Sequence, residues 1–257
     1  MSINMEQDEI LKVNRDGWDK AAPHFSGVTA LPVYGPLIET EAELGLFDDI
    51  NTKKVLEIGC GDGYSLEYMS AKGAGEIWGL DLSTVQIEAA RKHLDFCGIA
   101  ANLFAAPMEK DIGLPKEYFD IVFSIYALGW TTELSATLSL VFSYLKPGGS
   151  FIFSWEHPVY SCLSMENEKL ILSKSYNEEG HFLTDSWRGK SPIVMHRRKM
   201  STYINELVDA GFQIEIMIEG SLPEKYLQED DSTSEKWYSV RKAKLMPTTM
   251  IIKARKK

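Results

Sequence analysis

Two hydrophobic patterns alternate along most of the chain. Short apolar runs of strand length are followed by longer segments that mix apolar and polar residues, as amphipathic helices do. Strands that alternate with such helices predict right-handed βαβ units and a parallel sheet covered on both faces. The predicted helix over residues 133–149 is expected to end at Pro147 and Gly148, since proline cannot continue a helix and glycine commonly follows one. The predicted strands occupy residues 53–60, 76–83, 101–106, 119–128 and 150–155, and the predicted helices occupy residues 65–73, 84–98 and 133–149.

The alternation stops at both ends of this region. Residues 1–50 predict helical and loop segments broken by prolines, and residues 156–198 are rich in aromatic and polar residues without a clear period. A helix is expected over residues 197–212. The two strands after it have no convincing helix between them, so they should pair antiparallel. The pattern predicts one domain, residues 1–257, with an insertion at the edge where the strands end, which is where α/β sheets bind ligands.

Composition and charge exclude several classes of function. The chain has 257 residues, a net charge of -10 and no apolar run that approaches the length of a membrane span. The acidic charge disfavours a nucleic-acid partner, because binding there depends on basic residues that neutralise phosphates. Three cysteines without CxxC or zinc-site spacing predict free thiols, a cytoplasmic location and no metal site. The polar, acidic N-terminus is not typical of a secretory signal.

The loop after the first strand holds three glycines at alternate positions, Gly59, Gly61 and Gly63. Glycines at the carboxyl end of a strand lack Cβ atoms, so a ligand can touch the main chain there. The dinucleotide fingerprint requires its third glycine one position later, where this chain has Tyr64. A pyrophosphate cradle is therefore the poorer fit.

Two carboxylates beside this loop define the charge of the expected ligand. Glu57 precedes the glycines and would repel a phosphate but attract a cation. Asp81 ends the second strand, where a carboxylate can accept two hydrogen bonds from a ribose diol. Asp81 could instead cap the following helix, although Ser83 and Gln86 already give that helix a capping-box signature. A nucleoside with positive charge and no phosphate fits these features, and S-adenosylmethionine is the common molecule of that description.

Four motifs carry a resemblance to a known family. VLEIGCGDG (residues 55–63), GLDLS (79–83), FDIVFSIYAL (119–128) and LKPGGSFIFS (145–154) resemble the motifs of class I S-adenosylmethionine-dependent methyltransferases, in the group that includes ubiquinone- and menaquinone-biosynthesis enzymes. The resemblance implies an α/β, doubly wound, Rossmann-like sheet of seven strands with the last one antiparallel. It also implies that residues 1–50 form an N-terminal helical lid segment and that residues 156–198 cover the substrate.

By position, the resemblance implies a set of cofactor-binding residues. Where the family usually has an aspartate this chain has Pro107, so recognition of the adenine edge would pass to the Met108 backbone or to Glu109. Cys60 has no visible activating partner, which favours a space-filling role over a nucleophile. The implied set is Glu57, Gly59, Cys60, Gly61 and Gly63 beside the methionine half, Asp81 at the ribose, Leu82, Gln86, Met108 and Glu109 around the adenine, and Ser124 and Ile125 beneath the ribose and sulfur.

Several further residues are candidates for a role near the reaction. Trp18 and Phe25 either anchor the N-terminal helix or fold over the cofactor as a lid, as a similar segment does in the family. Tyr126 is a candidate catalytic residue, because an aromatic face can stabilise the sulfonium by roughly 0.5–2 kcal/mol. Trp130 could act in the same way or pack in the core. His157 is a candidate general base, and a structural loop residue is the competing interpretation.

Methyl transfer is an in-line displacement that needs positioning and desolvation rather than a triad or metal. The aromatic residues at and within the insertion favour a small apolar or aromatic acceptor. We expect the protein to be a monomer or homodimer, with no nucleic-acid or membrane partner. The competing functions are a nicotinamide-dependent oxidoreductase, a non-catalytic nucleoside-binding module and an RNA methyltransferase. The aromatic residues in question are Trp155, Tyr160, Tyr176, Phe182 and Trp187.

Overall fold

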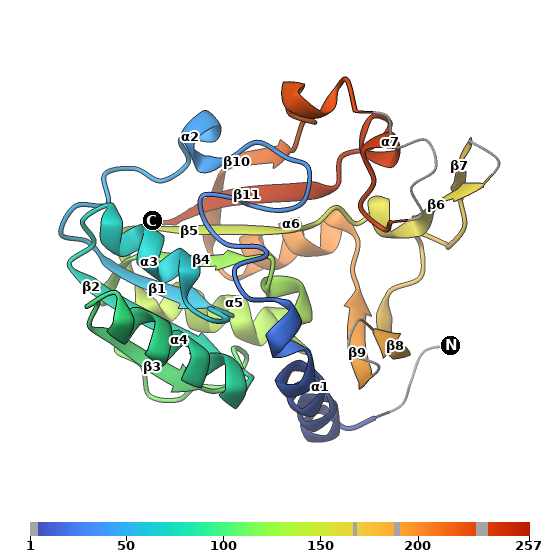
Figure 1. Cartoon of the computed structure of the whole chain (residues 1–257). Helices are drawn as coiled ribbons and strands as arrows, with labels where there is room; N and C mark the ends of the chain where they lie inside the picture. The colour runs from blue at the N-terminus through green and yellow to red at the C-terminus, as the bar shows by residue number, and fades with distance from the viewer. Residues whose placement is uncertain (1–4, 167–168, 188–190, 230–235) are drawn as a thin grey trace.

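A seven-stranded sheet forms the centre of the molecule (Figure 1). The computed structural model describes residues 5–166, 169–187, 191–229 and 236–257. The strands follow the order β10-β11-β5-β4-β1-β2-β3. Strands β1 to β5 run parallel, and β11 is antiparallel to both β5 and β10, which confirms the predicted fold class and terminal pair. The strands are β1 (Lys54–Ile58), β2 (Glu76–Asp81), β3 (Ala101–Ala105), β4 (Phe119–Ile125), β5 (Leu145–Glu156), β10 (Phe212–Glu219) and β11 (Thr249–Lys256).

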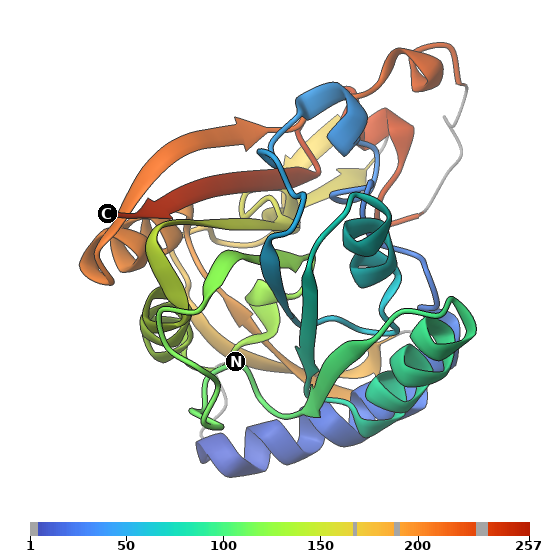
Figure 2. The ribbon, with the colours of Figure 1, turned by 90° about the vertical axis from the view of Figure 1, so that its left-hand side faces the viewer.

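Helices cover both faces of this sheet, as Figure 2 shows. Helices α3 and α4 pack on one face with α1 beside them, and α5 and α6 pack on the other. The helices are α1 (Gln7–Ala21), α2 (Glu41–Leu44), α3 (Tyr64–Ala71), α4 (Thr84–Phe96), α5 (Leu134–Tyr144), α6 (Met200–Asp209) and α7 (Val240–Ala243), with the short 3-10 turns η1 (Ala22–His24), η2 (Leu128–Trp130), η3 (Tyr160–Cys162) and η4 (Glu224–Tyr226).

One apolar core lies on each side of the sheet. Leu66 of α3 and Leu94 of α4 belong to one core, and Leu138 of α5 and Leu207 of α6 belong to the other. Every residue of β4 except Asp120 is buried between them. A parallel strand covered on both faces has no solvent side, which explains why the apolar residues of this stretch, interrupted only by Asp120 and Ser124, do not alternate with polar ones.

The start of β5 differs from the prediction. The residues expected to close helix α5, Lys146 to Gly149, are the first part of the strand. The pairing of β4 with β5 is irregular there: Phe119 pairs with Leu145, and the next pair is Ile121 with Ser150. Pro147 cannot continue a helix and Gly148 has φ 79°, so the chain turns outward before it joins the regular ladder.

The insertion, residues 156–198, contains two antiparallel hairpins that the sequence pattern did not reveal. Strand β6 (Leu163–Glu166) pairs with β7 (Lys169–Leu172), and β8 (Gly180–Trp187) pairs with β9 (Ser191–Arg197). The side chain of Trp187 lies outside the described part of the structure.

Helix α1 and strand β9 are joined although they are far apart in the sequence (Figure 1). The Asn14 amide donates a hydrogen bond of 3.0 Å to the Val194 carbonyl and accepts one of 2.8 Å from the Val194 N–H. A Cβ on Gly17 would lie 2.8 Å from the Pro192 carbonyl oxygen, so only glycine permits this approach. The N-terminal segment and the insertion therefore form one wall. Within the described residues, no helix has the length and apolar character that crossing a membrane requires.

Candidate functional site

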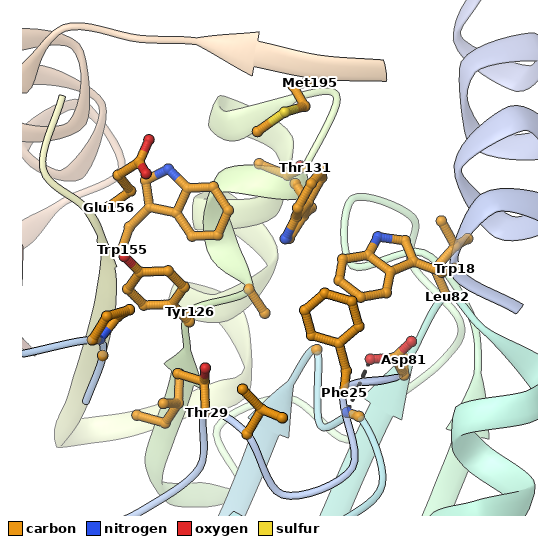
Figure 3. Close-up of a pocket in the computed structure, with 18 of the residues that line it drawn as sticks. Trp18, Phe25, Thr29, Asp81, Leu82, Tyr126, Thr131, Trp155, Glu156 and Met195 are labelled. Atoms are coloured by element: carbon orange, nitrogen blue, oxygen red, sulfur yellow. Dashed lines mark hydrogen bonds between the residues drawn. The ribbon is translucent and has the colours of Figure 1, made fainter. Parts of the chain in front are cut away.

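A cavity of about 870 Å³ lies at the carboxyl ends of β1, β2, β4 and β5. The sheet forms its floor, and residues 11–37 and parts of the insertion form its walls. The sheet order changes direction between β1 and β4, the topological switch point at which open α/β sheets bind ligands. Figure 3 shows Trp18, Phe25 and Asp81 on one side of this cavity and Tyr126, Trp155 and Glu156 on the other.

The glycine loop presents bare backbone to the cavity. The N–H groups of Gly59 and Cys60 both donate to the Leu80 carbonyl, at 2.8 and 3.0 Å, and fix the loop against β2. Gly59 has φ 74°, and a Cβ there would lie 2.2 Å from the Ala127 Cβ. Gly61 has φ 52° and no atom within 4 Å of a built Cβ. Gly59 is therefore required by packing, whereas Gly61 leaves space that a ligand can enter.

Asp81 organises the loop from the end of β2. Its Oδ2 accepts a hydrogen bond of 3.0 Å from the Gly61 N–H (Figure 3). Its Oδ1 accepts one of 2.8 Å from the Ser83 N–H. Asp81 therefore holds the turn before α4, while Ser83 is the N-cap of that helix and its hydroxyl accepts from the Gln86 N–H. Burial raises the pKa of Asp81 to about 6. Each carboxylate oxygen keeps one acceptor position for a ligand.

Glu57 is a buried carboxylate of the site with an unsatisfied hydrogen-bond acceptor. Its side chain is 2% exposed, and its Oε2 atom has no hydrogen-bond partner among the described residues. Burial raises the pKa of Glu57 well above its usual range, and the charges of Asp81 and Asp62 raise it further. An uncompensated buried carboxylate favours a cationic ligand, which supplies both charge and hydrogen bonds.

The residues predicted around the adenine line the cavity, but one of them is already engaged. Leu82 and Met108 contribute apolar surface, and Gln86 is buried beside them. The Oε1 atom of Glu109 accepts hydrogen bonds from the Thr132 N–H at 2.8 Å and the Thr132 hydroxyl at 2.6 Å. Glu109 therefore fastens the segment that leads into α5.

Cys60 and Ile125 are buried core residues that also touch the cavity. Burial raises the pKa of the Cys60 thiol well above its usual range, so the thiolate that a nucleophile needs is disfavoured. This agrees with a space-filling role for Cys60.

Two predicted cofactor residues, Gly63 and Ser124, do not line the cavity. A Cβ on Gly63 would point toward Ala90 and Leu94 of α4, so this glycine serves helix packing. The Ser124 hydroxyl donates to the Ile58 carbonyl at 2.9 Å and is completely buried. Both residues support the floor of the site and do not face its space.

The general-base interpretation of His157 gains no support from its position. The ring is 2% exposed and is absent from the cavity lining. Its Nδ1 accepts from the Val159 N–H at 3.2 Å, so Nε2 carries the proton and donates to Glu219 at 2.8 Å. With both ring nitrogens occupied, His157 fixes the loop after β5, which was the competing interpretation.

Five aromatic rings connect the two sides of the cavity. Trp18 packs edge-on against Phe25 and Trp130, with ring centroids 5.3 and 5.1 Å apart. Trp130 continues to Trp155 at 5.7 Å, and Trp155 to Tyr126 at 5.4 Å. All five line the cavity. The rings give the space above the glycine loop an apolar wall.

Sequence reasoning missed several residues that line the cavity, notably Glu156, Lys174 and Tyr238. Glu156 could have been found, because it ends the fifth strand as Asp81 ends the second. Tyr238 gave no local signal, since it reaches the site from a loop near the C-terminal end of the described chain.

Comparisons with known proteins identify the family. Residues 55–149 match a family model described as a methyltransferase domain. An uncharacterized protein of Haemophilus influenzae is 32% identical over 233 residues, 86% of this chain and 87% of that protein. A ubiquinone biosynthesis O-methyltransferase of Neisseria meningitidis serogroup C is 26% identical over 155 residues, 59% of this chain and 63% of that protein.

Among solved structures, an S-adenosylmethionine-dependent methyltransferase from Mesorhizobium loti superposes with a TM-score of 0.69 at 26% identity, over 83% of this chain and 95% of that chain. The strand order, the antiparallel β11 and the glycine loop define a Rossmann-like methyltransferase fold. The chain belongs to the S-adenosylmethionine-dependent methyltransferases, and S-adenosylmethionine is its cofactor.

Proposed function

We propose that this protein transfers the methyl group of S-adenosylmethionine to a small apolar or aromatic acceptor inside the cavity. The observation that carries the proposal is that one cavity holds two carboxylates, the buried Glu57 and the half-buried Asp81, on one side and an aromatic wall on the other. The cavity volume of about 870 Å³ lies near the upper end of the range of roughly 300–1,000 Å³ for small-molecule sites. Such a volume suits a cofactor and an acceptor together.

The residues present fit the cofactor. The unpartnered Oε2 of Glu57 would accept a hydrogen bond from the ammonium group, and the free acceptor positions of Asp81 would hold the ribose diol. The open face of Gly61 would admit the methionine backbone, and Leu82 and Met108 would contact the adenine. When bound, the cofactor supplies an activated methyl group on a positively charged sulfur.

The residues of the chain would contribute orientation and desolvation. Trp18 and Phe25 lie on the same side of the cavity as Asp81 and would help to keep water from the bound cofactor (Figure 3). Tyr126 follows β4 directly and faces the space above the loop, where its ring could stabilise positive charge by roughly 0.5–2 kcal/mol. Residues 1–50 would act as a lid in this arrangement, and residues 156–198 would form the acceptor end.

Two observations favour a small acceptor over RNA. The net charge of -10 disfavours a phosphate-rich partner, and the acceptor side of the cavity is walled by aromatic rings. A relative is named a ubiquinone biosynthesis O-methyltransferase, which supports a small-molecule acceptor here as well.

Calorimetry with S-adenosylmethionine and S-adenosylhomocysteine tests the cofactor assignment, and we expect saturable one-to-one binding. Formation of S-adenosylhomocysteine is then measured with a library of small aromatic compounds and, separately, with bulk tRNA and protein. Turnover confined to tRNA or protein would contradict the proposed acceptor class. Cofactor binding without turnover of any substrate would favour a nucleoside-binding module.

A further inference from the structure

A chain of hydrogen bonds leads from the cavity to a carboxylate at the end of β5. The Tyr126 hydroxyl donates to the Tyr238 hydroxyl at 3.0 Å, and the Tyr238 hydroxyl donates to Oε2 of Glu156 at 2.6 Å. The Trp237 indole N–H donates to the same oxygen at 2.5 Å. All four residues line the cavity. The carboxylate end of this network, Glu156, lies across the cavity from Asp81, the residue expected to hold the ribose (Figure 3).

The backbone at Tyr126 is held in an unfavourable conformation that keeps its ring in this network. Its φ of 56° is uncommon for a bulky residue, and such conformations cost on the order of 1–3 kcal/mol. The Tyr126 N–H donates to both the carbonyl and the hydroxyl of Ser154, at 3.1 and 3.2 Å. Strain that the surroundings enforce in this way is concentrated at functional sites.

We propose that Tyr126, Tyr238 and Glu156 form a proton relay for methyl transfer to a neutral hydroxyl group. The proposal rests on the proposed function and narrows its acceptor class to compounds with an O–H nucleophile. Tyr126 is the residue that contacts the acceptor. Tyr238 and Glu156 are positioning residues that act through Tyr126. Tyr238 passes the proton on, and Glu156 is its final acceptor.

The step balances in atoms and electrons. The acceptor oxygen forms a bond to the methyl carbon, the bond from that carbon to sulfur breaks, and its electron pair remains on sulfur. The acceptor proton passes to the Tyr126 hydroxyl, the Tyr126 proton passes to Tyr238, and the Tyr238 proton passes to Glu156. Glu156 ends protonated, and both tyrosines end neutral.

The surroundings suit these roles. Burial raises the pKa of Glu156, which makes its carboxylate a better base. Burial also raises the pKa of Tyr126 and of Tyr238 well above the usual range, so both stay neutral and carry protons rather than charge. The other charged or titratable groups that act on this network are Lys174, Lys242, Tyr160 and Tyr203.

The acidity of the acceptor distinguishes a relay from a structural role. Formation of S-adenosylhomocysteine is measured with a series of phenols from unsubstituted phenol to 4-nitrophenol and with matched anilines. In Glu156→Gln and in Tyr238→Phe, we expect kcat/KM for phenol to fall by about a hundredfold. For 4-nitrophenol, which ionises without help at mildly alkaline pH, the loss should stay below about fivefold. Tyr126→Phe should show the same dependence.

Matched controls lie away from the cavity. Glu88→Gln on the exposed side of α4 and Tyr118→Phe beside Glu76 repeat the same chemical changes and should leave every rate unchanged. Calorimetry with S-adenosylmethionine should give the wild-type Kd for all relay variants, and thermal unfolding shows that each is folded. Should Glu156→Gln not fold, Tyr238→Phe keeps the carboxylate and still breaks the relay.

Two results would overturn the relay while the proposed function survives. One is an equal loss for all phenols, and the other is wild-type turnover of anilines but of no phenol. A wild-type protein that does not bind S-adenosylmethionine would instead remove the proposed function itself.

Discussion

The Asp19 carboxylate of α1 accepts a hydrogen bond of 2.6 Å from the hydroxyl of Ser83, the N-cap of α4. The same carboxylate accepts from the Thr84 hydroxyl and the Val85 N–H, each at 3.3 Å. The Ser83 N–H in turn donates to Asp81. The N-terminal helix therefore docks on the turn that carries the expected ribose-binding carboxylate.

This contact predicts that Asp19 controls cofactor retention. In Asp19→Ala the N-terminal segment loses a partly buried charge-assisted hydrogen bond, whose net value is roughly 1.5–3 kcal/mol. We expect the Kd of S-adenosylmethionine to rise about tenfold through faster dissociation. Calorimetry and stopped-flow fluorescence measure the two effects. Asp16→Ala, which breaks an exposed pair with Lys12 on the same helix, is the control. Equal dissociation rates in both variants would contradict a lid role.

Two glycines of the same loop have different roles: Gly59 is required by packing, and Gly61 leaves space for a ligand. Gly59→Ala places a methyl group against the Ala127 Cβ and should destabilise the fold by several kcal/mol, because neither backbone can yield. Gly61→Ala meets open space, so only its positive φ costs stability, by roughly 1–2 kcal/mol. Its methyl group would enter the space expected for the methionine half, so cofactor affinity should fall well beyond the loss of stability.

Denaturant unfolding and calorimetry on both variants test this division. Gly113→Ala, at an open surface position with φ 80°, gives the cost of the backbone conformation alone. A Gly61→Ala protein with wild-type affinity would show that no ligand approaches this backbone.

The fold could be predicted because buried parallel strands produce continuous apolar runs. Strand β4 is one example: the strand predicted over residues 119–128 is observed as Phe119–Ile125, three residues shorter at its end. Asp81 was found for a related reason, since the carboxyl end of a parallel strand must face the ligand edge. Both rules depend only on a few consecutive residues, so they can be applied to the sequence without knowledge of the fold.

The side of the cavity around Glu156 and Tyr238 could not be predicted by local rules. Tyr238 donates to Glu156, 82 residues earlier in the chain, and no periodicity connects the two. His157 followed the fifth strand as a functional residue would, but the orientation of its ring depends on Glu219 of β10, which the sequence does not place. Hairpin β8–β9 packs against α1 through Asn14, so its pattern reflects a partner about 180 residues away.

We expect the Glu57 carboxylate to lower the stability of the ligand-free protein and to raise its affinity for S-adenosylmethionine. Its Oε2 is buried and has no hydrogen-bond partner in the described part of the chain, so Glu57→Gln removes a group that destabilises the empty protein. We expect the melting temperature without ligand to stay equal or to rise. The increase in melting temperature caused by S-adenosylmethionine should shrink, because the charge that attracts the ammonium group is gone. Thermal unfolding with and without the cofactor measures both quantities.

The control is Glu67→Gln, which changes a partly exposed carboxylate of α3 paired with His93. It should leave the cofactor-induced increase intact. A Glu57→Gln protein that is less stable without ligand and equally stabilised by the cofactor would mean that Glu57 serves the fold alone.

Asp81 predicts how pH acts on stability and binding in opposite directions. Its folded pKa of about 6 lies above the ordinary value of 3.8. The empty folded protein therefore holds this proton more tightly than the unfolded chain, and the contribution of Asp81 to stability falls as pH rises through this window. The ribose diol needs the carboxylate, so the affinity for S-adenosylmethionine should rise over the same range. The charged groups that act on Asp81 are Asp19 and Asp62.

Calorimetry from roughly pH 5 to about pH 7.5 measures this dependence, and the increase in affinity should level off above the folded pKa. In Asp81→Asn the backbone hydrogen bonds can partly persist, but the step near pH 6 should vanish and the Kd near neutral pH should rise about tenfold or more. Asp62→Asn removes the neighbouring negative charge. Because that charge raises the pKa of Asp81, the midpoint of the affinity increase should move to lower pH. An unchanged step in Asp81→Asn would assign the titration to Glu57, the buried carboxylate that precedes the glycine loop, and remove Asp81 from ribose recognition.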